Sequence, residues 1–232
     1  MNLSPSAQPL FVAQGIKKSF FKAKAEIAVI RGVDLTIHTG EMVAITGASG
    51  VGKSTLLHVL GTLEAPSAGK VLFGEKMQDL FSFSEKALSS FRNRALGFVF
   101  QFHYLLPEFT ALENVMMPAL IAGYPEGQAR KQAQELLEFV GLSHRLTHRP
   151  SELSGGEQQR VAIARAVILR PRIILADELT GNLDSVNSAN IMDLLIRLNQ
   201  STGVAILLVT HDLQLAARMH RVLRMKDGVF VS

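Results

Sequence analysis

The chain has 232 residues, of which 47% are hydrophobic and 19% are charged, and its formal net charge at pH 7 is +4. This composition is typical of one large folded domain and excludes a disordered chain, while the low net charge gives no indication of nucleic-acid binding. Cysteine is absent, which excludes disulfides, cysteine-ligated zinc and thiol catalysis. We expect no signal peptide, because the start MNLSPSAQPL lacks a basic n-region and an apolar h-region. We also expect no membrane-spanning segment, because no uncharged apolar run reaches about 18 residues.

The first third of the chain is expected to be mostly β-structure. Strands are predicted at residues 11–20, 29–40, 41–46 and 69–75, which are rich in β-forming residues and separated by turn signals. The run 41–46, EMVAIT, is short and apolar, as in a buried strand, and it ends in a glycine loop. A helix is predicted to start near Ser54.

Helical patterning is expected from about Leu80 to Leu169. Thr110 and Glu113 form a Thr-x-x-Glu capping box, which predicts the start of a helix. Residues 128–140 have the periodicity of an amphipathic helix, and Gly141 follows them as a stop signal.

A second capping box, Ser154 with Glu157, opens a helix that is predicted to run toward Pro171. Gly155 and Gly156 occupy its first turn, where each glycine costs about 1 kcal/mol relative to alanine. Glycine at a helix N-terminus favours close approach of an anion such as phosphate. The alternative is a flexible loop before an ordinary helix.

The last part of the chain alternates strands and helices. Residues 172–177 and 204–212 contain apolar runs typical of buried strands, and residues 189–199 carry apolar side chains at helical spacing. Residues 221–232 predict a hairpin about Asp227-Gly228. Continuous apolar strands that alternate with helices indicate an α/β protein with a largely parallel sheet and helices on both faces.

The stretch GASGVGKST, between a predicted strand and a predicted helix, matches the phosphate-binding pattern G-x-x-x-x-G-K-[ST]. Its glycines allow successive backbone N–H groups to surround phosphates, Lys53 reaches the β- and γ-phosphates, and the Ser54 hydroxyl ligates Mg²⁺. We call residues 47–55 the P-loop. The predicted ATP-binding residues in it are Gly47, Ala48, Ser49, Gly50, Val51, Gly52, Lys53, Ser54 and Thr55.

Three polar side chains follow predicted buried strands. Asp177 ends one such strand, where it is suited to Mg²⁺ binding, and Glu178 beside it is placed to polarise an attacking water. A carboxylate pair at a strand end is also often a helix cap. His211 follows another buried strand, at the edge where open α/β sheets place their sites, and it is a candidate for contacting the γ-phosphate.

Six motifs appear in this order: the P-loop, Gln101, LSGGEQ (153–158), LADE (175–178), GNLD (181–184) and THD (210–212). They resemble, over nearly the whole chain, the ATP-binding subunits of ABC transporters. The resemblance implies a P-loop NTPase core of mostly parallel sheet with flanking helices, an N-terminal antiparallel β subdomain and an inserted helical subdomain. Residues 1–232 would then form one ABC ATPase domain, with the core and β subdomain at about 1–84 and 171–232 and the helical subdomain at about 85–170.

The same resemblance implies Mg²⁺-dependent ATP hydrolysis by two copies of the chain that sandwich two nucleotides head to tail. Residues that would contact the ATP held by the partner's P-loop are Ser154, Gly155, Gly156, Glu157 and Gln158. Residues assigned to catalysis are Gln101, Glu178 and His211, and those assigned to Mg²⁺ are Ser54, Gln101 and Asp177. Asp184 would bridge the two sites. Phe20 would stack on adenine, with adjacent Phe21 as the alternative.

Residues 101–123 and 148–166 are similar to the ATPase subunit of bacterial lipoprotein-releasing systems, the LolD type. This resemblance implies two integral membrane permease subunits as partners and a place on the cytoplasmic face of the inner membrane. Leu179 departs from it, because proline is usual at that position. Alternatives are cell-division (FtsE-type) and macrolide-export (MacB-type) ATPases, a soluble ABC ATPase acting on DNA or ribosomes, and a small-molecule P-loop kinase.

The segment 101–114 carries five large apolar residues around a proline: Phe102, Tyr104, Leu105, Leu106 and Phe109. Pro107 and Thr110 indicate a loop, and loops run over protein surfaces. We therefore expect an exposed apolar surface to which a cytoplasmic helix of each membrane subunit binds. The alternative is that these side chains fill the core.

Overall fold

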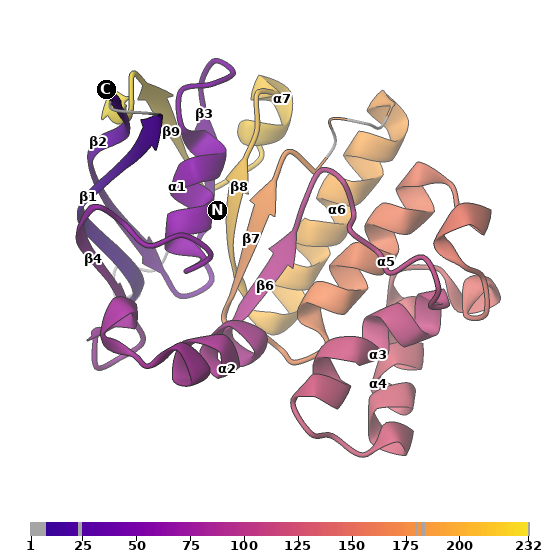
Figure 1. The fold of residues 1–232 in the computed structure, drawn as a ribbon. Coiled ribbons are helices and arrows are strands. Elements are labelled where there is room, and N and C mark those ends of the chain that lie inside the picture. The colour runs from indigo at the N-terminus through magenta and orange to yellow at the C-terminus, as the bar shows by residue number, and fades with distance from the viewer. Residues whose placement is uncertain (1–7, 23–24, 180, 182–183, 232) are drawn as a thin grey trace. The chain divides into compact units, whose positions relative to one another are not determined.

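The computed structural model describes residues 8–22, 25–179, 181 and 184–231 (Figure 1). The chain divides into two compact units. Unit 1 consists of Met1–Arg92 together with Ala205–Ser232, and unit 2 consists of Asn93–Val204.

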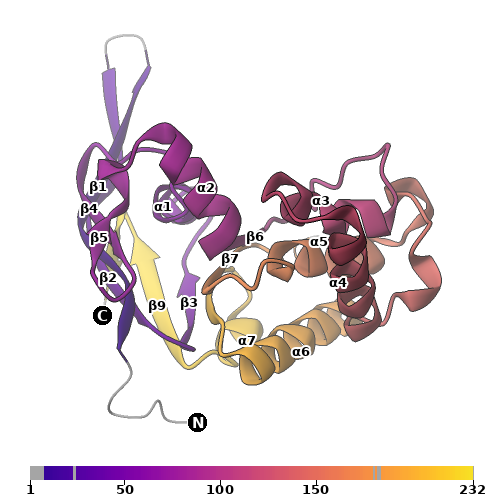
Figure 2. The same ribbon diagram turned by 90° about the horizontal axis from the view of Figure 1, so that it is seen from below.

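Unit 1 contains an antiparallel sheet in the order β2-β1-β4-β5. Its strands are β1 (Pro9–Lys22), β2 (Ala25–His38), β4 (Ala68–Phe73) and β5 (Gln78–Asp79). Strands β1 and β2 run side by side as a long hairpin (Figure 2). The buried side chains of this sheet, among them Phe11, Ile16 and Ile37, form an apolar face. The predicted N-terminal antiparallel β subdomain is confirmed.

Unit 1 also contains parallel strands. The central one is β3 (Met42–Thr46), which pairs in parallel with β8 (Ala205–Val209) and β9 (Arg221–Lys226). All five residues of β3 and of β8 are buried, which explains their unbroken apolar sequences. Strand β10 (Val229–Val231) returns along β9 as the predicted hairpin. Asp227 and Gly228 between them have φ of 49° and 80°, as a two-residue hairpin turn with both central residues at positive φ requires.

Two helices of unit 1 follow its parallel strands. α1 (Lys53–Leu60) follows the P-loop, and the short α7 (Leu213–Ala216) follows β8. α2 (Glu85–Ala95) begins in unit 1 and ends in unit 2. Leu56, Leu57 and Leu60 on α1 are fully buried, so this helix is anchored by its apolar face.

Unit 2 is mainly helical, with α3 (Ala111–Ile121), α4 (Glu126–Phe139), α5 (Gly155–Val167) and α6 (Ser185–Thr202). Helices α3, α4 and α5 pack against one another, and α6 packs on α5 (Figure 1). The capping boxes predicted at Thr110 and Ser154 are both present, so both helix starts are confirmed. α5 ends at Val167, before the Pro171 toward which it was predicted to run.

The range from about Leu80 to Leu169, for which helical patterning was expected, also contains a strand. The strand β6 (Leu96–Val99) lies in that range and pairs in parallel with β7 (Ile173–Asp177). Four apolar residues are too few for a periodicity to distinguish strand from helix. The packing is tight at Gly97, where a Cβ would lie 2.7 Å from the Ala166 carbonyl oxygen. Parallel pairing with a distant strand therefore decides the conformation here.

In the part of the chain that the structure describes, no helix combines the length and the apolar character that a membrane span requires.

Candidate functional site

The P-loop in unit 1 leaves β3 at buried Thr46 and turns into α1. Gly47, Gly50 and Gly52 have φ of 154°, 79° and 100°, a region that side chains rarely adopt. A Cβ at Gly52 would also lie 2.9 Å from the Ile30 side chain. Glycine is therefore needed at these positions for the backbone to adopt its conformation. Backbones of this kind, with successive N–H groups turned to one side, form the phosphate-binding loops of other proteins.

Lys53 is the cation of this loop. It is buried, and its Nζ donates to the carbonyl oxygens of Gly47 at 3.0 Å and Ala48 at 2.9 Å. Helix α1 has no side-chain cap and no acidic residue in its first turn, and Ser54 there is exposed. The uncapped helix start, the ammonium group and the hydroxyl fit the phosphates and the divalent cation of a nucleotide.

His211 lies beside the P-loop within unit 1. An open cavity of about 510 Å³ is lined by Gly47, Ala48, Val51 and His211, together with side chains of β9. The neighbours of His211 fix the loop, because the Thr210 hydroxyl accepts the Asp212 N–H at 3.0 Å and Asp212 caps α7. The structure thus brings the predicted histidine to the predicted phosphate-binding loop.

The same cavity is lined by two cations that sequence reasoning missed, Arg224 and Lys226. Arg224 pairs with Thr46 across the parallel strands β9 and β3. These residues are far apart in the chain, and the register of two parallel strands cannot be read from either strand alone. Their alternation with apolar residues along β9 is the only sequence signal that they carry.

Phe20 and Phe21 lie near the end of β1 and are both exposed. The Lys18 Nζ lies 4.9 Å from the centre of the Phe20 ring and also bonds Glu64 at 2.8 Å. Adjacent strand residues point to opposite faces, so only one of the two rings can face a given ligand. The assignment of Phe20 to adenine remains a prediction.

In unit 2, Gln101 and Glu178 follow neighbouring parallel strands. Val99 of β6 is paired with Ala176 of β7, and Gln101 and Glu178 each lie two residues beyond these partners. The Gly181 N–H donates to the Glu178 carbonyl oxygen at 3.1 Å, and a Cβ at Gly181 would lie 2.6 Å from Gln101 Nε2. The glutamine predicted for catalysis therefore contacts the loop that follows the predicted catalytic glutamate.

Glu178 has a φ of 49°, which is uncommon for a residue with a side chain. Asp177 and Glu178 are both partly exposed, whereas Leu179 beyond them is buried. At the position where proline is usual, this chain therefore has a leucine whose side chain is part of the core. In the GNLD motif, Asn182 and Leu183 lie outside the described residues.

The first turn of α5 is held by its capping box. Ser154 Oγ accepts the Glu157 N–H at 3.3 Å, and Glu157 Oε2 accepts the Ser154 N–H at 2.8 Å. Glu157 Oε1 also accepts from Arg145 Nε at 2.9 Å. The backbone N–H of Ser154, with help from Arg145, lowers the pKa of Glu157 from 4.5 to about 2. The carboxylate is therefore fixed in its charged form.

The start of α5 also contacts the start of α6. Gly156 is buried, and a Cβ there would lie 3.1 Å from the side-chain oxygen of Asn187. Asp184 caps α6, accepting the Asn187 N–H at 2.8 Å and its side-chain amide at 2.7 Å, and these bonds lower the pKa of Asp184. Asp184, predicted to bridge two sites, is thereby connected through Asn187 to the Gly155-Gly156 turn.

The segment after Gln101 is an exposed loop, as predicted. The exposed fractions of its apolar side chains are 62% for Phe102, 66% for Tyr104, 39% for Leu106 and 36% for Phe109, and Leu105 is half-buried. We call residues 102–109 the aromatic loop. The alternative, in which all these side chains fill the core, is wrong.

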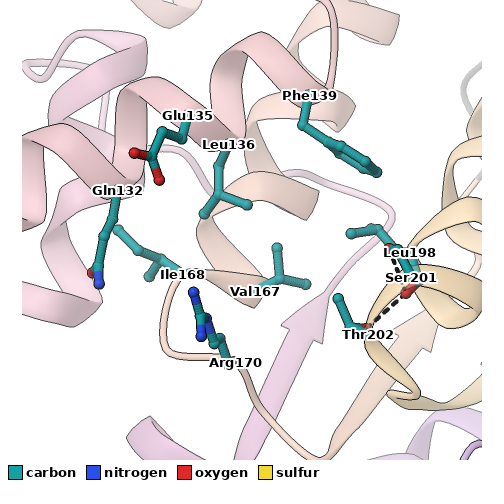
Figure 3. A pocket seen from close by; sticks show the side chains of 10 residues that line it. All are labelled: Gln132, Glu135, Leu136, Phe139, Val167, Ile168, Arg170, Leu198, Ser201 and Thr202. Carbon is teal, nitrogen blue, oxygen red and sulfur yellow. Dashed lines mark hydrogen bonds between the residues drawn. The ribbon is translucent and has the colours of Figure 1, made fainter.

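A second cavity of about 330 Å³ lies in unit 2 between α4, the end of α5 and α6 (Figure 3). Its walls combine aliphatic side chains and Phe139 with polar and charged ones, among them Arg170. None of the predicted site residues lines it.

Residues 30–181 match the ABC transporter family model, and the chain belongs to this family of ATP-binding proteins. It is an ATP-binding cassette ATPase. Two relatives are the lipoprotein-releasing system ATP-binding proteins LolD of Syntrophus aciditrophicus and Geobacter metallireducens. The first is 53% identical, covering 94% of this chain and 97% of that protein, and the second is 52% identical, covering 96% and 98%.

The fold is likewise that of a solved cassette. A dimeric post-hydrolysis state of the ATP-binding cassette MJ0796, bound to ADP and Pi, is similar with a TM-score of 0.88 and 37% identity. The match covers 96% of this chain and 97% of that one. The predicted fold class and family are confirmed.

Proposed function

We propose that this chain is the ATP-hydrolysing subunit of a complex that releases lipoproteins from the bacterial inner membrane toward a periplasmic carrier. The observation that carries this proposal is the similarity to lipoprotein-releasing ATP-binding proteins, which covers 94% and 96% of the chain in two relatives. The exposed aromatic loop supports it, since a subunit that powers membrane proteins needs a surface to contact them.

In the proposed reaction, the P-loop binds the phosphates of ATP and Lys53 neutralises their charge. Glu178 polarises the attacking water, while Gln101 and His211 orient it relative to the γ-phosphate. Mg²⁺, for which Ser54, Gln101 and Asp177 are the candidate ligands, supplies charge neutralisation at the phosphates. Phe20 stacks on the adenine.

The variant Glu178→Gln tests this assignment. It keeps the size of the side chain and removes only the base, so ATP should still bind while turnover falls about 10²- to 10⁴-fold. Glu138→Gln, which changes an exposed glutamate in the same unit, is the matched control. Turnover close to wild type in Glu178→Gln would show that another residue polarises the water.

We further propose that two copies of the chain close head to tail around two nucleotides. The exposed turn Ser154–Gly155 of one copy then contacts the ATP of the other, and Asp184 lies between the two sites. A mixed dimer of Lys53→Ala and Gly155→Asp chains distinguishes the arrangements. Sites formed in trans leave one composite site intact and about half of the activity per dimer. Sites formed within single chains leave no activity, which would contradict the proposal.

The aromatic loop is proposed to bind the cytoplasmic helices of two integral membrane subunits, which holds the chain peripherally at the cytoplasmic face of the inner membrane. Leu106→Glu and Phe109→Glu should abolish co-purification with membrane proteins while leaving ATP binding and thermal stability nearly unchanged. Phe139→Glu, another exposed apolar site in unit 2, is the control and should co-purify normally. Unfolding of the Leu106 and Phe109 variants, or normal co-purification, would contradict the docking proposal.

A further inference from the structure

The backbone of the aromatic loop is fixed although its side chains are exposed. Asn114 on α3 has no exposed surface, and its amide nitrogen donates to the carbonyl oxygens of Leu106, Phe109 and Thr110 at 3.0–3.1 Å. Its Oδ1 accepts the Leu106 N–H at 2.8 Å. One buried side chain thus lies within hydrogen-bond distance of four backbone groups, which makes the second half of the loop a preorganised surface.

The first half of the loop is held from α5. Arg165 Nη2 donates to the His103 carbonyl oxygen and Nη1 to the Tyr104 carbonyl oxygen, both at 2.7 Å. The two bonds use the planar fork of the guanidinium, which a lysine cannot reproduce. Tyr104 has a φ of 46°, an unfavourable conformation that Arg165 helps to hold.

A second contact joins the same helix face to the same loop. Gln158 precedes Arg165 by seven residues, about two helical turns, so both lie on one face of α5. The Gln158 amide nitrogen donates to Pro150 and Leu153, and its side chain also hydrogen-bonds the ring of His103. Since α5 begins at the Ser154–Glu157 turn, a single rigid helix connects the loop to that turn.

We propose that Arg165 is a positioning residue that transmits displacement of the aromatic loop to α5, and thereby sets the position of the Ser154–Gly156 turn. The inference rests on the proposed function, in which a membrane subunit binds the loop and the turn contacts the partner's ATP. A helix moves as a rigid element, and a two-bond fork to the loop backbone couples the two more tightly than apolar contacts do. The coupling is reciprocal, so ATP at the turn also changes the loop.

The test separates docking from transmission. Wild-type and Arg165→Met chains are reconstituted in liposomes with the membrane subunits that co-purify with the wild-type chain. Methionine keeps the aliphatic length and removes both bonds. Arg165→Lys retains the charge but not the fork. It is the second variant, and it keeps the test informative if Arg165→Met does not fold. Arg170→Met is the matched control, because Arg170 lies just beyond α5, is exposed and lines the cavity of Figure 3.

We expect Arg165→Met to keep basal ATPase activity of the isolated chain and binding of the membrane subunits within about twofold of wild type. The ratio of ATPase activity with membrane subunits to basal activity should fall about tenfold. Typical couplings between two sites correspond to factors of about 5 to 150. Arg165→Lys should be intermediate and Arg170→Met unchanged. Amide hydrogen exchange supplies a second measure, since ATP should protect residues 103–106 in the wild-type chain and not in Arg165→Met.

A wild-type activity ratio in Arg165→Met would overturn the proposal while leaving docking intact. Loss of membrane-subunit binding in that variant would also overturn it, because Arg165 would then only shape the docking surface. Failure of docking itself is detected independently, by normal co-purification of Leu106→Glu.

Discussion

Helices α1 and α5 both begin beside glycines, but their first turns are completed in opposite ways. Gly52 precedes α1 with a φ of 100°, and no side chain caps that helix. Ser154 precedes α5 with an extended backbone, and its capping box with Glu157 is complete. Helix α1 therefore begins without a side-chain cap, whereas the start of α5 is satisfied in part by its own residues.

The completed box leaves a defined surface on α5. The first four N–H groups of a helix lack partners within it, and the box supplies partners for those of Ser154 and Glu157. Among the described residues, no hydrogen-bond partner is found for the N–H groups of Gly155 and Gly156. If the turn contacts the partner's ATP as proposed, the groups that stabilise the turn differ from the N–H groups that would contact the ligand.

The largest expected effect is at the open helix start. Lys53→Ala should weaken ATP binding about 10- to 150-fold, because a lost charged hydrogen-bond donor costs about 1.5–3 kcal/mol. Lys76→Ala, an exposed lysine in the same unit, is the control and should bind normally. Isothermal titration calorimetry measures both affinities. Nearly normal affinity in the Lys53 variant would remove the assignment of the P-loop.

Gly155→Asp tests whether α5 serves a second chain. The added carboxylate should repel phosphate, so ATP-driven dimerisation should weaken at least about tenfold while ATP binding by the single chain stays within about twofold. Gly127→Asp places the same change in the first turn of α4, where nothing lies near the new Cβ. Sedimentation with ATP measures dimerisation. Equal dimerisation of the two variants would contradict a role in trans.

Ser154→Ala should lower the free energy of unfolding by about 1 kcal/mol through loss of the cap. Thr110→Ala removes the matching cap of α3 and should cost a similar amount. Urea unfolding measures both, and only the Ser154 variant should also weaken ATP-driven dimerisation. If both variants weakened it alike, the defect would follow from stability rather than from contact with ATP.

The smallest effect concerns pH. The pKa of Glu157 is lowered from 4.5 to about 2 on folding, so its contribution to stability is complete above pH 4.5 and is lost as pH falls toward 2. In Glu157→Gln this part of the acid dependence should be absent. Thermal unfolding between those pH values measures it, with Glu126→Gln in the uncapped first turn of α4 as the control. An unchanged acid profile in Glu157→Gln would show that another carboxyl group is responsible for this part of the pH dependence.

The sequence by itself determined the elements whose causes lie within a few residues. The P-loop, both capping boxes and the Asp227-Gly228 turn depend on local backbone conformation and on hydrogen bonds between residues at most six apart. The buried strands β3 and β8 were also predicted from their own residues, because a short continuous apolar run bounded by turn signals is typical of a buried strand.

Only the tertiary structure decided contacts between distant residues. Strand β6 needed β7 as its parallel partner, and the register of that pair brought Gln101 to the loop after Glu178. No pattern in the sequence indicated that Arg165 bonds the aromatic loop, which lies about sixty residues earlier in the chain. Such contacts depend on how separate elements pack. The free energy of packing comes from many side chains of several elements, so no single segment of the sequence determines it.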